Sequence, residues 1–363
     1  MNNGFKALGL SDEVYRGIVR MGFRMPTPVQ RKALPVVLTG SDACVMARTG
    51  SGKTIAFLVP LLEKLLKSNA SMSSSSSVTG GNQQRLRQSS CRAVILSPTR
   101  ELSIQTLKVL AKLAHFTELK SIGIHGGEGM EKQFDMLASK PDIIVATPGR
   151  LAHHLTEIPD FNLQNCMVCI LDEGDRCMEM GFSQQIRQVS KTMPEYCQKV
   201  ILSATMPKSL VEFTKSGFCT DPQVVRLDNE CSVSDELRIA FLTIRSSEKD
   251  AALLHVLHQI QQDLKENDTL RTGLTIIFAA TRHHVEFIHT LLETSGISST
   301  LIYGTLNQDA RKANLHAFRS GKKNVLVVTD VAARGIDVPL IDHVSCFSLT
   351  SFDNYDRHMI SYD

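Results

Sequence analysis

The chain has 363 residues, of which 42% are hydrophobic and 21% charged, and its formal net charge at pH 7 is +3. This composition is typical of a globular protein with enough apolar residues for two cores, and no apolar run reaches the roughly 18 residues of a membrane helix. The small net charge excludes attraction of nucleic acid by the whole surface, so such contacts depend on local patches. The nine cysteines are scattered through apolar segments, which predicts a reducing intracellular compartment.

Short β-branched runs, separated by longer segments of helical periodicity, predict strands that are buried on both faces. They lie at residues 43–46, 93–96, 143–146, 168–171, 200–202, 275–278, 300–302 and 325–328. Runs that are apolar throughout are typical of parallel sheets built from βαβ units. We therefore expect two α/β domains, residues 1–228 and 236–363, joined by a polar linker at 229–235. The serine-rich segment 68–90 is predicted to be a disordered surface insertion.

A phosphate-binding loop is predicted directly after the first strand. It comprises Ala47, Arg48, Thr49, Gly50, Ser51, Gly52, Lys53 and Thr54. Small residues allow backbone N–H groups to surround a β-phosphate, and the following helix N-terminus attracts negative charge. We expect Lys53 to reach the β- and γ-phosphates of ATP and the Thr54 hydroxyl to ligate Mg²⁺. The alternative is a glycine-rich turn that only caps a helix.

Three acidic residues follow the strand at 168–171, namely Asp172, Glu173 and Asp175. Ligands of open α/β sheets bind at the carboxyl ends of strands. We expect Asp172 to hold Mg²⁺ through water and Glu173 to orient or deprotonate an attacking water. Acids on a surface loop are often only solvated charge, but these end a buried strand downstream of a phosphate loop.

Taken together, these motifs resemble the DEAD-box ATP-dependent RNA helicases of superfamily 2, from about Phe5 to about Val344. The resemblance implies an α/β fold of two tandem RecA-like domains, each a mostly parallel sheet flanked by helices, with the second incomplete. It also implies that Phe23 stacks on the adenine and that Gln30 hydrogen-bonds its edge. By the same resemblance, Ser203 and Thr205 couple ATP hydrolysis to strand separation. Gly335 and Asp337 are implied to contribute to ATP binding, with Asp337 near the ribose.

The resemblance assigns RNA contacts to residues of both domains. These are Pro98, Thr99, Arg100, Gly126, Gly127, Thr147, Pro148, Gly149, Arg150, Arg282, Arg311 and Thr329. They offer backbone amides, hydroxyls and isolated arginines, which suit contact with phosphate and ribose without reading of bases. We therefore expect sequence-independent RNA binding that weakens with salt.

Within the family, the stretches that begin at Ala7, Ser203 and Ala310 resemble the nucleolar helicases of large ribosomal subunit assembly. This resemblance implies a nuclear, nucleolar protein of ribosome biogenesis with pre-ribosomal particles as partners. We expect a monomer without membrane contact.

Two departures from the family pattern are visible. Gly174 stands where the family has alanine, and we expect a modest loss of rate because glycine loosens the backbone that fixes Glu173. The arginine-rich sixth motif is absent after His358, which predicts missing arginine fingers and an uncovered sheet edge in the second domain. Truncation, a splice variant or a frameshift would each explain this ending.

Three functional hypotheses follow from these residues. The first is an RNA-stimulated ATPase that unwinds short duplexes by closing two domains on ATP and single-stranded RNA. The second is a protein that binds ATP and RNA but turns over poorly, because the arginine fingers are absent. The third, an NTPase acting on DNA or protein, is disfavoured by the adenine and RNA-backbone motifs.

Overall fold

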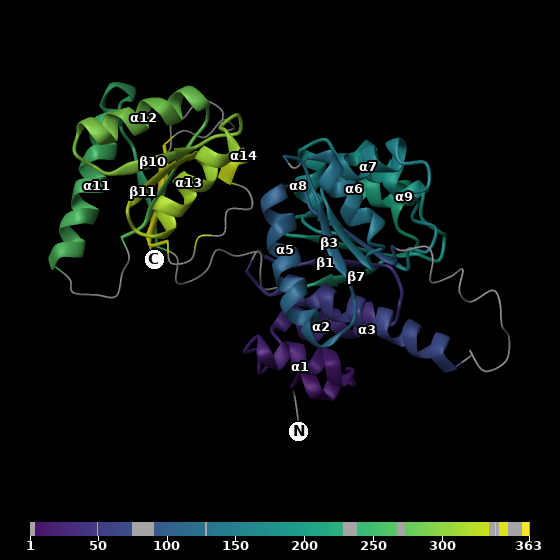
Figure 1. The fold of residues 1–363 in the computed structure, drawn as a ribbon. Helices are drawn as coiled ribbons and strands as arrows, with labels where there is room; N and C mark the ends of the chain where they lie inside the picture. Colours follow the sequence, from purple (N-terminus) through teal and green to yellow (C-terminus); the bar gives the residue numbers. More distant parts are fainter. Residues whose placement is uncertain are drawn as a thin grey trace. The chain divides into compact units, whose positions relative to one another are not determined.

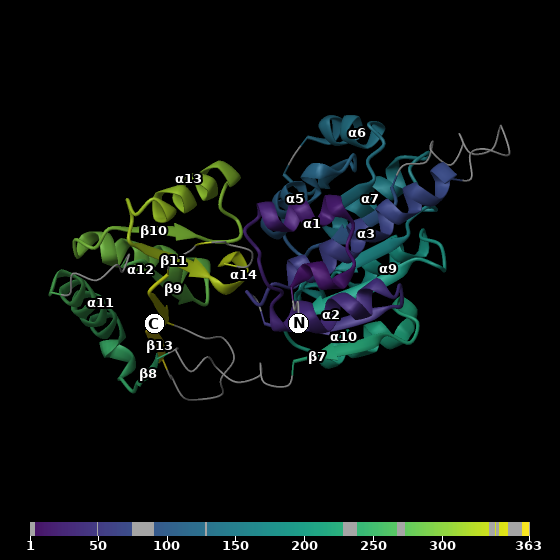
Figure 2. The same cartoon turned by 90° about the horizontal axis from the view of Figure 1, so that it is seen from below.

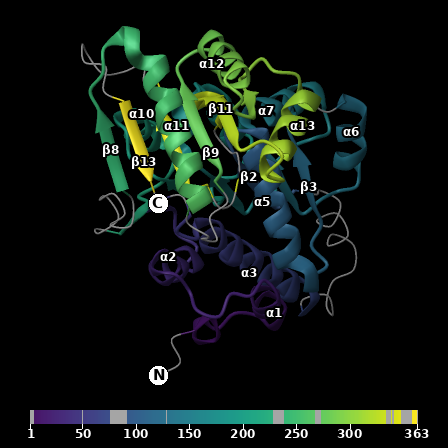
Figure 3. The same ribbon diagram turned by 90° about the vertical axis from the view of Figure 1, so that its left-hand side faces the viewer.

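The protein is described by a computed structural model that covers residues 4–48, 50–74, 91–127, 129–227, 238–266, 273–333, 338, 341–347 and 358–362. The chain divides into two compact units, Met1–Cys231 and Ser232–Asp363, which Figures 1, 2 and 3 show from three directions. Within the described ranges, no helix is both long and apolar enough to cross a bilayer.

The first unit contains a seven-stranded, fully parallel sheet with the order β3-β4-β2-β5-β6-β1-β7. Its strands are β1 (Ala43–Met46), β2 (Ala93–Leu96), β3 (Ser121–Ile124), β4 (Ile143–Ala146), β5 (Val168–Leu171), β6 (Gln198–Ser203) and β7 (Gln223–Arg226). The prediction of a buried parallel sheet is confirmed. The sequence did not indicate β3, whose run is interrupted by Gly123, or the edge strand β7, three of whose four residues are exposed.

Helices cover both faces of this sheet (Figure 1). They are α1 (Asp12–Arg20), α2 (Pro28–Leu38), α3 (Lys53–Ser74), α5 (Arg100–Leu113), α6 (Met130–Ala138), α7 (Pro148–Glu157), α8 (Gly174–Glu179), α9 (Ser183–Lys191) and α10 (Lys208–Phe213), with short turns η1 (Phe5–Leu8), η2 (Ala114–Phe116) and η3 (Thr214–Phe218). Alternate residues of each strand enter different cores: Ala93 and Ile95 pack with α1 to α3, whereas Val94 and Leu96 pack with α7 to α10. This alternation explains why the interior strands are apolar throughout.

The prediction that an irregular insertion begins at residue 68 is wrong for its first seven residues. The helix α3 continues to Ser74, since Ala70 and Met72 are good helix formers that extend the preceding turns. The remainder of the predicted insertion, residues 75–90, lies outside the described residues.

The second unit contains a six-stranded sheet with the order β10-β11-β9-β12-β13-β8. Its elements are β8 (Arg238–Leu242), η4 (Ser246–Glu248), α11 (Lys249–Glu266), β9 (Thr275–Ala279), α12 (Arg282–Thr294), β10 (Ser299–Ile302), α13 (Gln308–Arg319), β11 (Val325–Thr329), α14 (Asp330–Ala333), β12 (His343–Cys346) and β13 (His358–Tyr362). Four adjacent strands, from β10 to β12, are parallel.

The predicted open edge next to β12 is wrong. The strand β13 pairs antiparallel with β12 on one side and with β8 on the other. Its residues include Ile360 and Tyr362, which are strong strand formers, so this segment completes the ladder although it lacks the arginine-rich motif expected there. On this side of the sheet the edge strand is β8, and β10 is the edge strand on the other side.

Candidate active site

The predicted motifs of the first unit meet at one edge of its sheet. The described residues of 47–54 follow β1, residues 172–175 follow β5, and Ser203 ends β6, with Thr205 just after it; these strands are adjacent in the order β5-β6-β1. Residues 98–100, 126–127 and 147–150 follow β2, β3 and β4, which are adjacent in the order β3-β4-β2. Because all seven strands are parallel, these segments share the carboxyl edge of the sheet, where open α/β sheets bind ligands. We call the two groups the nucleotide half and the RNA half of this edge.

The phosphate loop joins β1 to α3, and its glycines make the tight path possible. Gly50 and Gly52 have φ values of 80° and 93°, which side chains rarely adopt. A Cβ at Gly52 would also lie 2.6 Å from the side-chain nitrogen of Gln30. Ser51 Oγ donates a hydrogen bond of 2.7 Å to the Arg48 carbonyl. The buried Lys53 donates to the Ala47 carbonyl, so its ammonium lies inside the loop, next to the half-buried Thr54.

The N-terminus of α2 contacts the phosphate loop directly. Thr27 and Gln30 form a capping box, in which Gln30 Oε1 accepts a hydrogen bond of 3.0 Å from the Thr27 amide. Gln30 Nε2 donates to the Gly52 carbonyl at 3.0 Å, and Thr27 Oγ1 donates to the Ser51 carbonyl at 2.8 Å. Gln30 is buried, whereas 38% of Phe23 is exposed. The structure therefore brings Gln30 to the loop and leaves the Phe23 ring accessible.

Asp172 and Glu173 lie at the end of β5. Asp172 is buried, and this burial, together with the charge of Glu173, raises the pKa of Asp172 to about 7 despite the nearby Lys53 ammonium. The Glu173 amide donates to Asp172 Oδ1 at 3.0 Å. Glu173 has φ 49° and ψ 54°, a left-handed conformation that is rare for a non-glycine residue and typical of functional sites. The turn thus brings the Asp172 carboxylate close enough to Lys53 of the phosphate loop for their charges to interact.

Asp175 connects this turn to the segment after β6. Thr205 donates to Asp175 Oδ2 through both its amide and its hydroxyl, at 3.0 and 2.8 Å. Ser203 Oγ accepts from the Asp175 amide at 3.2 Å and donates to the Thr205 carbonyl at 2.6 Å. Burial alone would raise the pKa of Asp175, but hydrogen bonds from Thr205 and Ser203 outweigh burial and lower it. These bonds join the acidic turn directly to the segment that ends β6.

In the RNA half, hydrogen bonds join the predicted motifs to one another. Thr99 caps α5 by accepting from the Leu102 amide at 3.3 Å. Arg100 donates from its guanidinium to the Gly127 carbonyl at 3.2 Å, and Gly127 has φ 81°. The motif after β2 is thereby linked to the motif after β3.

A second link runs through Gln133 of α6, which the sequence did not single out. Gln133 is fully buried. Its Oε1 accepts from Arg150 Nε at 3.2 Å and from His154 Nε2 at 2.8 Å, and its Nε2 donates to the His125 carbonyl at 3.0 Å. One side-chain amide thus ties Arg150 to the segment before Gly126. The sequence gives one sign of this role. Gln133 is a polar residue that lies four positions before Leu137, and therefore on the apolar stripe of α6.

The other predicted residues of the RNA half are placed by the backbone. Pro98 and Pro148 are buried, whereas Gly126 is exposed. Thr147 precedes α7, and its amide donates to the Ile124 carbonyl at 3.1 Å. Among the described residues, no atom would lie within 4 Å of a Cβ placed at Gly149, so the space beside this helix start is open.

The predicted residues of the second unit lie on three of its elements. Arg282 begins α12, is exposed, and lies 3.6 Å from Glu286. Arg311 of α13 donates to the Ala332 carbonyl at 2.7 Å, and Thr329 is the buried last residue of β11. The predicted sites Thr49, Gly335 and Asp337 fall outside the described residues.

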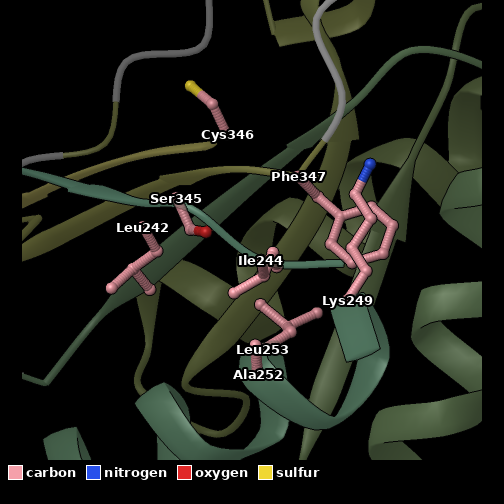
Figure 4. Close-up of a pocket in the computed structure, with 8 residues that line it drawn as sticks. All are labelled: Leu242, Ile244, Lys249, Ala252, Leu253, Ser345, Cys346 and Phe347. Carbon is pink, nitrogen blue, oxygen red and sulfur yellow. The ribbon is translucent and has the colours of Figure 1, made fainter. Parts of the chain in front are cut away.

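A small apolar pocket also lies in the second unit, between β8, α11 and the end of β12 (Figure 4). In it the Lys249 side chain crosses the Phe347 ring, with its ammonium 4.6 Å from the ring centroid, above Leu253. The pocket is lined by none of the predicted site residues. It therefore adds nothing to the candidate active site.

Comparison with known proteins gives a consistent result. A model of DEAD/DEAH box helicases matches residues 27–213, and a model of the helicase conserved C-terminal domain matches residues 249–361. The chain is 44% identical over 343 residues to DEAD-box ATP-dependent RNA helicase 29 of Oryza sativa subsp. indica, covering 94% of this chain and 37% of that protein. It is 42% identical over 376 residues to ATP-dependent RNA helicase DBP10 of Ajellomyces capsulatus, covering 96% and 40%. The chain spans about two fifths of the length of these relatives.

Among solved structures, the chain resembles S. cerevisiae Dbp5 bound to RNA and ADP BeF3. The TM-score is 0.76 and the sequence identity 26%, over 97% of this chain and 82% of that chain. This likeness confirms the predicted fold of two RecA-like domains. The first family model alone spans more than half of the chain. The chain belongs to the DEAD/DEAH box helicase family.

Proposed function

We propose that this protein is an ATP-dependent RNA helicase, in which RNA-stimulated ATP hydrolysis is coupled to local duplex unwinding or to remodelling of RNA–protein particles. The observation that carries this proposal is the shared carboxyl edge, where the nucleotide half and the RNA half lie side by side on adjacent strands. The ATP-dependent RNA helicases among its relatives support the same reaction class.

ATP is the proposed substrate of the nucleotide half. The loop from Ala47 to Thr54 binds the phosphates with its amides, and the Lys53 ammonium neutralises part of their charge. Phe23 stacks on the adenine, and Gln30, whose amide already contacts the loop, reads its edge. Asp337, with Gly335 beside it, is the proposed ribose contact.

The oxygen atoms of Thr54 and Asp172 suit Mg²⁺, which prefers hydroxyl, carboxylate and water ligands. Asp172 fits this role because its carboxylate is buried and its pKa is raised, so a cation beside it would relieve the cost of the buried charge. Bound Mg²⁺ would neutralise charge on the β- and γ-phosphates.

Glu173 is the proposed residue that orients, and accepts a proton from, the attacking water. Its left-handed backbone fixes the carboxylate at the end of β5. Asp175 does not meet the water in this proposal. It transmits the state of the acidic turn to Ser203 and Thr205 through its hydrogen bonds, and these residues couple hydrolysis to strand separation.

RNA is the proposed partner of the RNA half and of the second unit. The contacts are assigned to Pro98, Thr99, Arg100, Gly126, Gly127, Thr147, Pro148, Gly149, Arg150, Arg282, Arg311 and Thr329. The guanidinium groups of Arg100 and Arg150 donate to uncharged oxygen acceptors, and their positive charge suits contact with phosphate. Binding is therefore expected to be independent of sequence and sensitive to salt.

The cellular setting is proposed on the subgroup resemblance alone. We infer a monomer that acts on pre-ribosomal particles in the nucleolus, during ribosome biogenesis.

The domains are proposed to be residues 1–228 and 236–363, with a linker at 229–235.

The test is ATP hydrolysis with and without RNA by the full 363-residue chain. Hydrolysis by the wild-type protein should rise with RNA, and Glu173→Gln should lower it about 10²–10⁴-fold, because a general base contributes that much. Lys53→Ala should abolish both binding and turnover. Glu179→Gln, an exposed acid of the neighbouring helix, is the matched control and should keep full activity. Binding of ATP and RNA without turnover above the Lys53→Ala level would instead establish the binding-protein hypothesis.

A further inference from the structure

A second group of basic side chains lies away from the strand ends, where α1 packs against the end of α5 (Figures 1 and 3). The crossing is unusually close, because a Cβ at Gly17 would lie 2.1 Å from the carbonyl oxygen of Leu113. Only glycine at this position allows the two backbones to touch. The helices are therefore held in a fixed relation, and side chains that project from both share one rigid base.

Two guanidinium groups gather on one aromatic ring at this crossing. The guanidinium carbons of Arg16 and Arg20 lie 4.1 and 6.0 Å from the ring centroid of Phe116. The His115 ring meets the same phenylalanine edge-on, with 4.9 Å between centroids. Stacking of this kind orients guanidinium groups without neutralising them.

Beside the ring is an open hollow lined by Arg20, Met21, Ala111, Lys112 and His115. Arg20 and Lys112 are exposed. Within the ranges that the structure describes, neither forms an ion pair, and nor does Arg16. The acidic residues of α1 occupy its first turn, whereas Arg20 ends its last turn. The hollow is thus a concave, positively charged site whose charges repel one another until an anion enters.

We propose that this α1–α5 hollow is an accessory binding site for the phosphate backbone of RNA. The combination of stacked arginines, an aromatic ring and a lysine around a hollow suits the alternating phosphates and bases of a nucleic-acid strand. Its position favours RNA as the partner, because the same helix α5 carries Arg100 at its first residue and Lys112 near its last. The inference rests on the proposed RNA contact of Arg100.

The geometry sets the length of RNA that can use the site. Arg100 and Lys112 are twelve residues apart on one helix, which is about 18 Å at roughly 1.5 Å per residue. A stacked strand that rises about 3.4 Å per nucleotide covers this distance with about five nucleotides. These nucleotides come in addition to those that occupy the strand-end site. An RNA of about five nucleotides bound at the strand ends therefore does not extend to the hollow, whereas an RNA of about 20 nucleotides reaches it.

The experiment compares a double variant, Arg20→Gln with Lys112→Gln, with a matched control, Lys191→Gln with Arg226→Gln. The control removes two exposed positive charges from α9 and β7. Affinity for labelled oligouridylates of about 5 and about 20 nucleotides is measured by fluorescence anisotropy over a range of salt concentrations, in the presence of a non-hydrolysable ATP analogue. Thermal melting and ATP affinity verify that both proteins are folded.

For the longer RNA, we expect the double variant to bind more weakly and to lose about 1.4 from the slope of log affinity against log salt, at about 0.7 per phosphate contact on a single strand. The shorter RNA should bind both variants like the wild type. An unchanged slope in the double variant, an equal loss in the control, or an equal loss for both RNA lengths would each overturn the accessory site while leaving the proposed function intact. Failure of the wild-type protein to bind either RNA would overturn both.

Discussion

The two halves of the sheet edge hold their motifs together in different ways. In the nucleotide half, motif residues contact one another directly, as when Gln30 donates to Gly52 and Thr205 donates to Asp175. In the RNA half, Arg100 also contacts Gly127 directly, but the motifs that follow β3 and β4 are joined through Gln133, a residue outside every motif. The contacts of the nucleotide half can therefore be predicted from its motifs alone. Those of the RNA half also depend on α6, the helix between the motifs that follow β3 and β4.

The two halves also differ in the charged groups that they contain. The nucleotide half contains buried carboxylates whose pKa values move in opposite directions, that of Asp172 upward through burial and that of Asp175 downward through hydrogen bonds that outweigh burial. The RNA half presents Arg100 and Arg150 on uncharged acceptors. Changes in the first half should therefore alter chemistry and pH dependence, and changes in the second should alter the orientation of charge and thus the affinity for RNA.

The largest effect that tests this contrast is expected from Gln133→Met, which keeps the volume of the side chain but removes its hydrogen bonds with His125, Arg150 and His154. The His125 carbonyl and the His154 ring nitrogen lose buried partners, so the free energy of unfolding should fall by about 3 kcal/mol. Arg150 loses its orienting acceptor, so the affinity for RNA should fall about tenfold, a difference of about 1.4 kcal/mol. Denaturant unfolding and anisotropy with RNA measure the two quantities.

A purely structural role for Gln133 would lower stability without changing the RNA dependence of hydrolysis. The decisive measurement is therefore the RNA concentration for half-maximal ATPase stimulation, which should rise about tenfold in the variant while the maximal rate stays unchanged. Gln188→Met removes one exposed hydrogen bond to Thr156 and should change neither quantity. If the variant needs no more RNA than the wild type, the two halves do not differ in the way described above.

Much of the fold was predictable because it depends on local patterns. Each predicted strand of the first sheet is apolar on both faces, and each is followed by turn residues and an amphipathic helix. The strands that sequence reasoning missed are the interrupted strand β3, the strands β7, β8 and β13 at or next to a sheet edge, and the interior strand β12, whose apolar pattern is broken by His343 and Ser345. An edge strand needs apolar residues on one side only, so its pattern is weak. The pairing of β13 with β12 also joins segments that no local signal connects.

The candidate site was predictable to the extent that its residues are contiguous in the chain. The phosphate loop and the acidic turn each occupy a few consecutive residues after one strand. Gln133 was missed because its partners Arg150 and His154 are 17 and 21 positions away, and because a buried glutamine resembles any other polar residue of a helix. The hollow beside Phe116 was missed for the same reason, since α1 and η2 meet only in three dimensions.

An intermediate effect is expected from Thr205→Val, which tests the direct contacts of the nucleotide half. The variant removes the hydroxyl donor of the bond to Asp175 Oδ2 and leaves the backbone donor. Hydrogen bonds to charged groups contribute about 1.5–3 kcal/mol, so the free energy of unfolding at neutral pH should fall by about 2 kcal/mol. Unwinding of RNA should decline more than ATP hydrolysis, because the acidic turn is no longer held to the segment after β6.

The pH dependence of this loss has a defined sign. Hydrogen bonds lower the pKa of Asp175 below its ordinary value, so the stability they contribute is fully present above the pKa of the unfolded chain and is lost as pH falls through the lower pKa of the folded protein. The difference in stability between wild type and Thr205→Val should therefore be full at neutral pH and shrink in acid. Thr205→Ser keeps the hydroxyl and should behave like the wild type. A difference that is independent of pH would show that Asp175 is not the partner affected.

The smallest effect is expected from Gly174→Ala, which restores the family residue in the acidic turn. A Cβ at this position would lie 3.0 Å from Ile201 Cγ2 and 3.3 Å from Leu210 Cδ1, which are ends of flexible side chains. Alanine is favoured over glycine in a helix by about 0.5–1 kcal/mol, so helix propensity and tight packing should nearly offset one another in stability. The maximal rate of ATP hydrolysis should rise modestly, because the backbone after Glu173 becomes less free. Gly129→Ala, at an open position before α6, controls for a general effect of the substitution. A Gly174→Ala protein that hydrolyses ATP no faster than the wild type would show that the left-handed turn at Glu173 is already fixed by Asp175 and its partners.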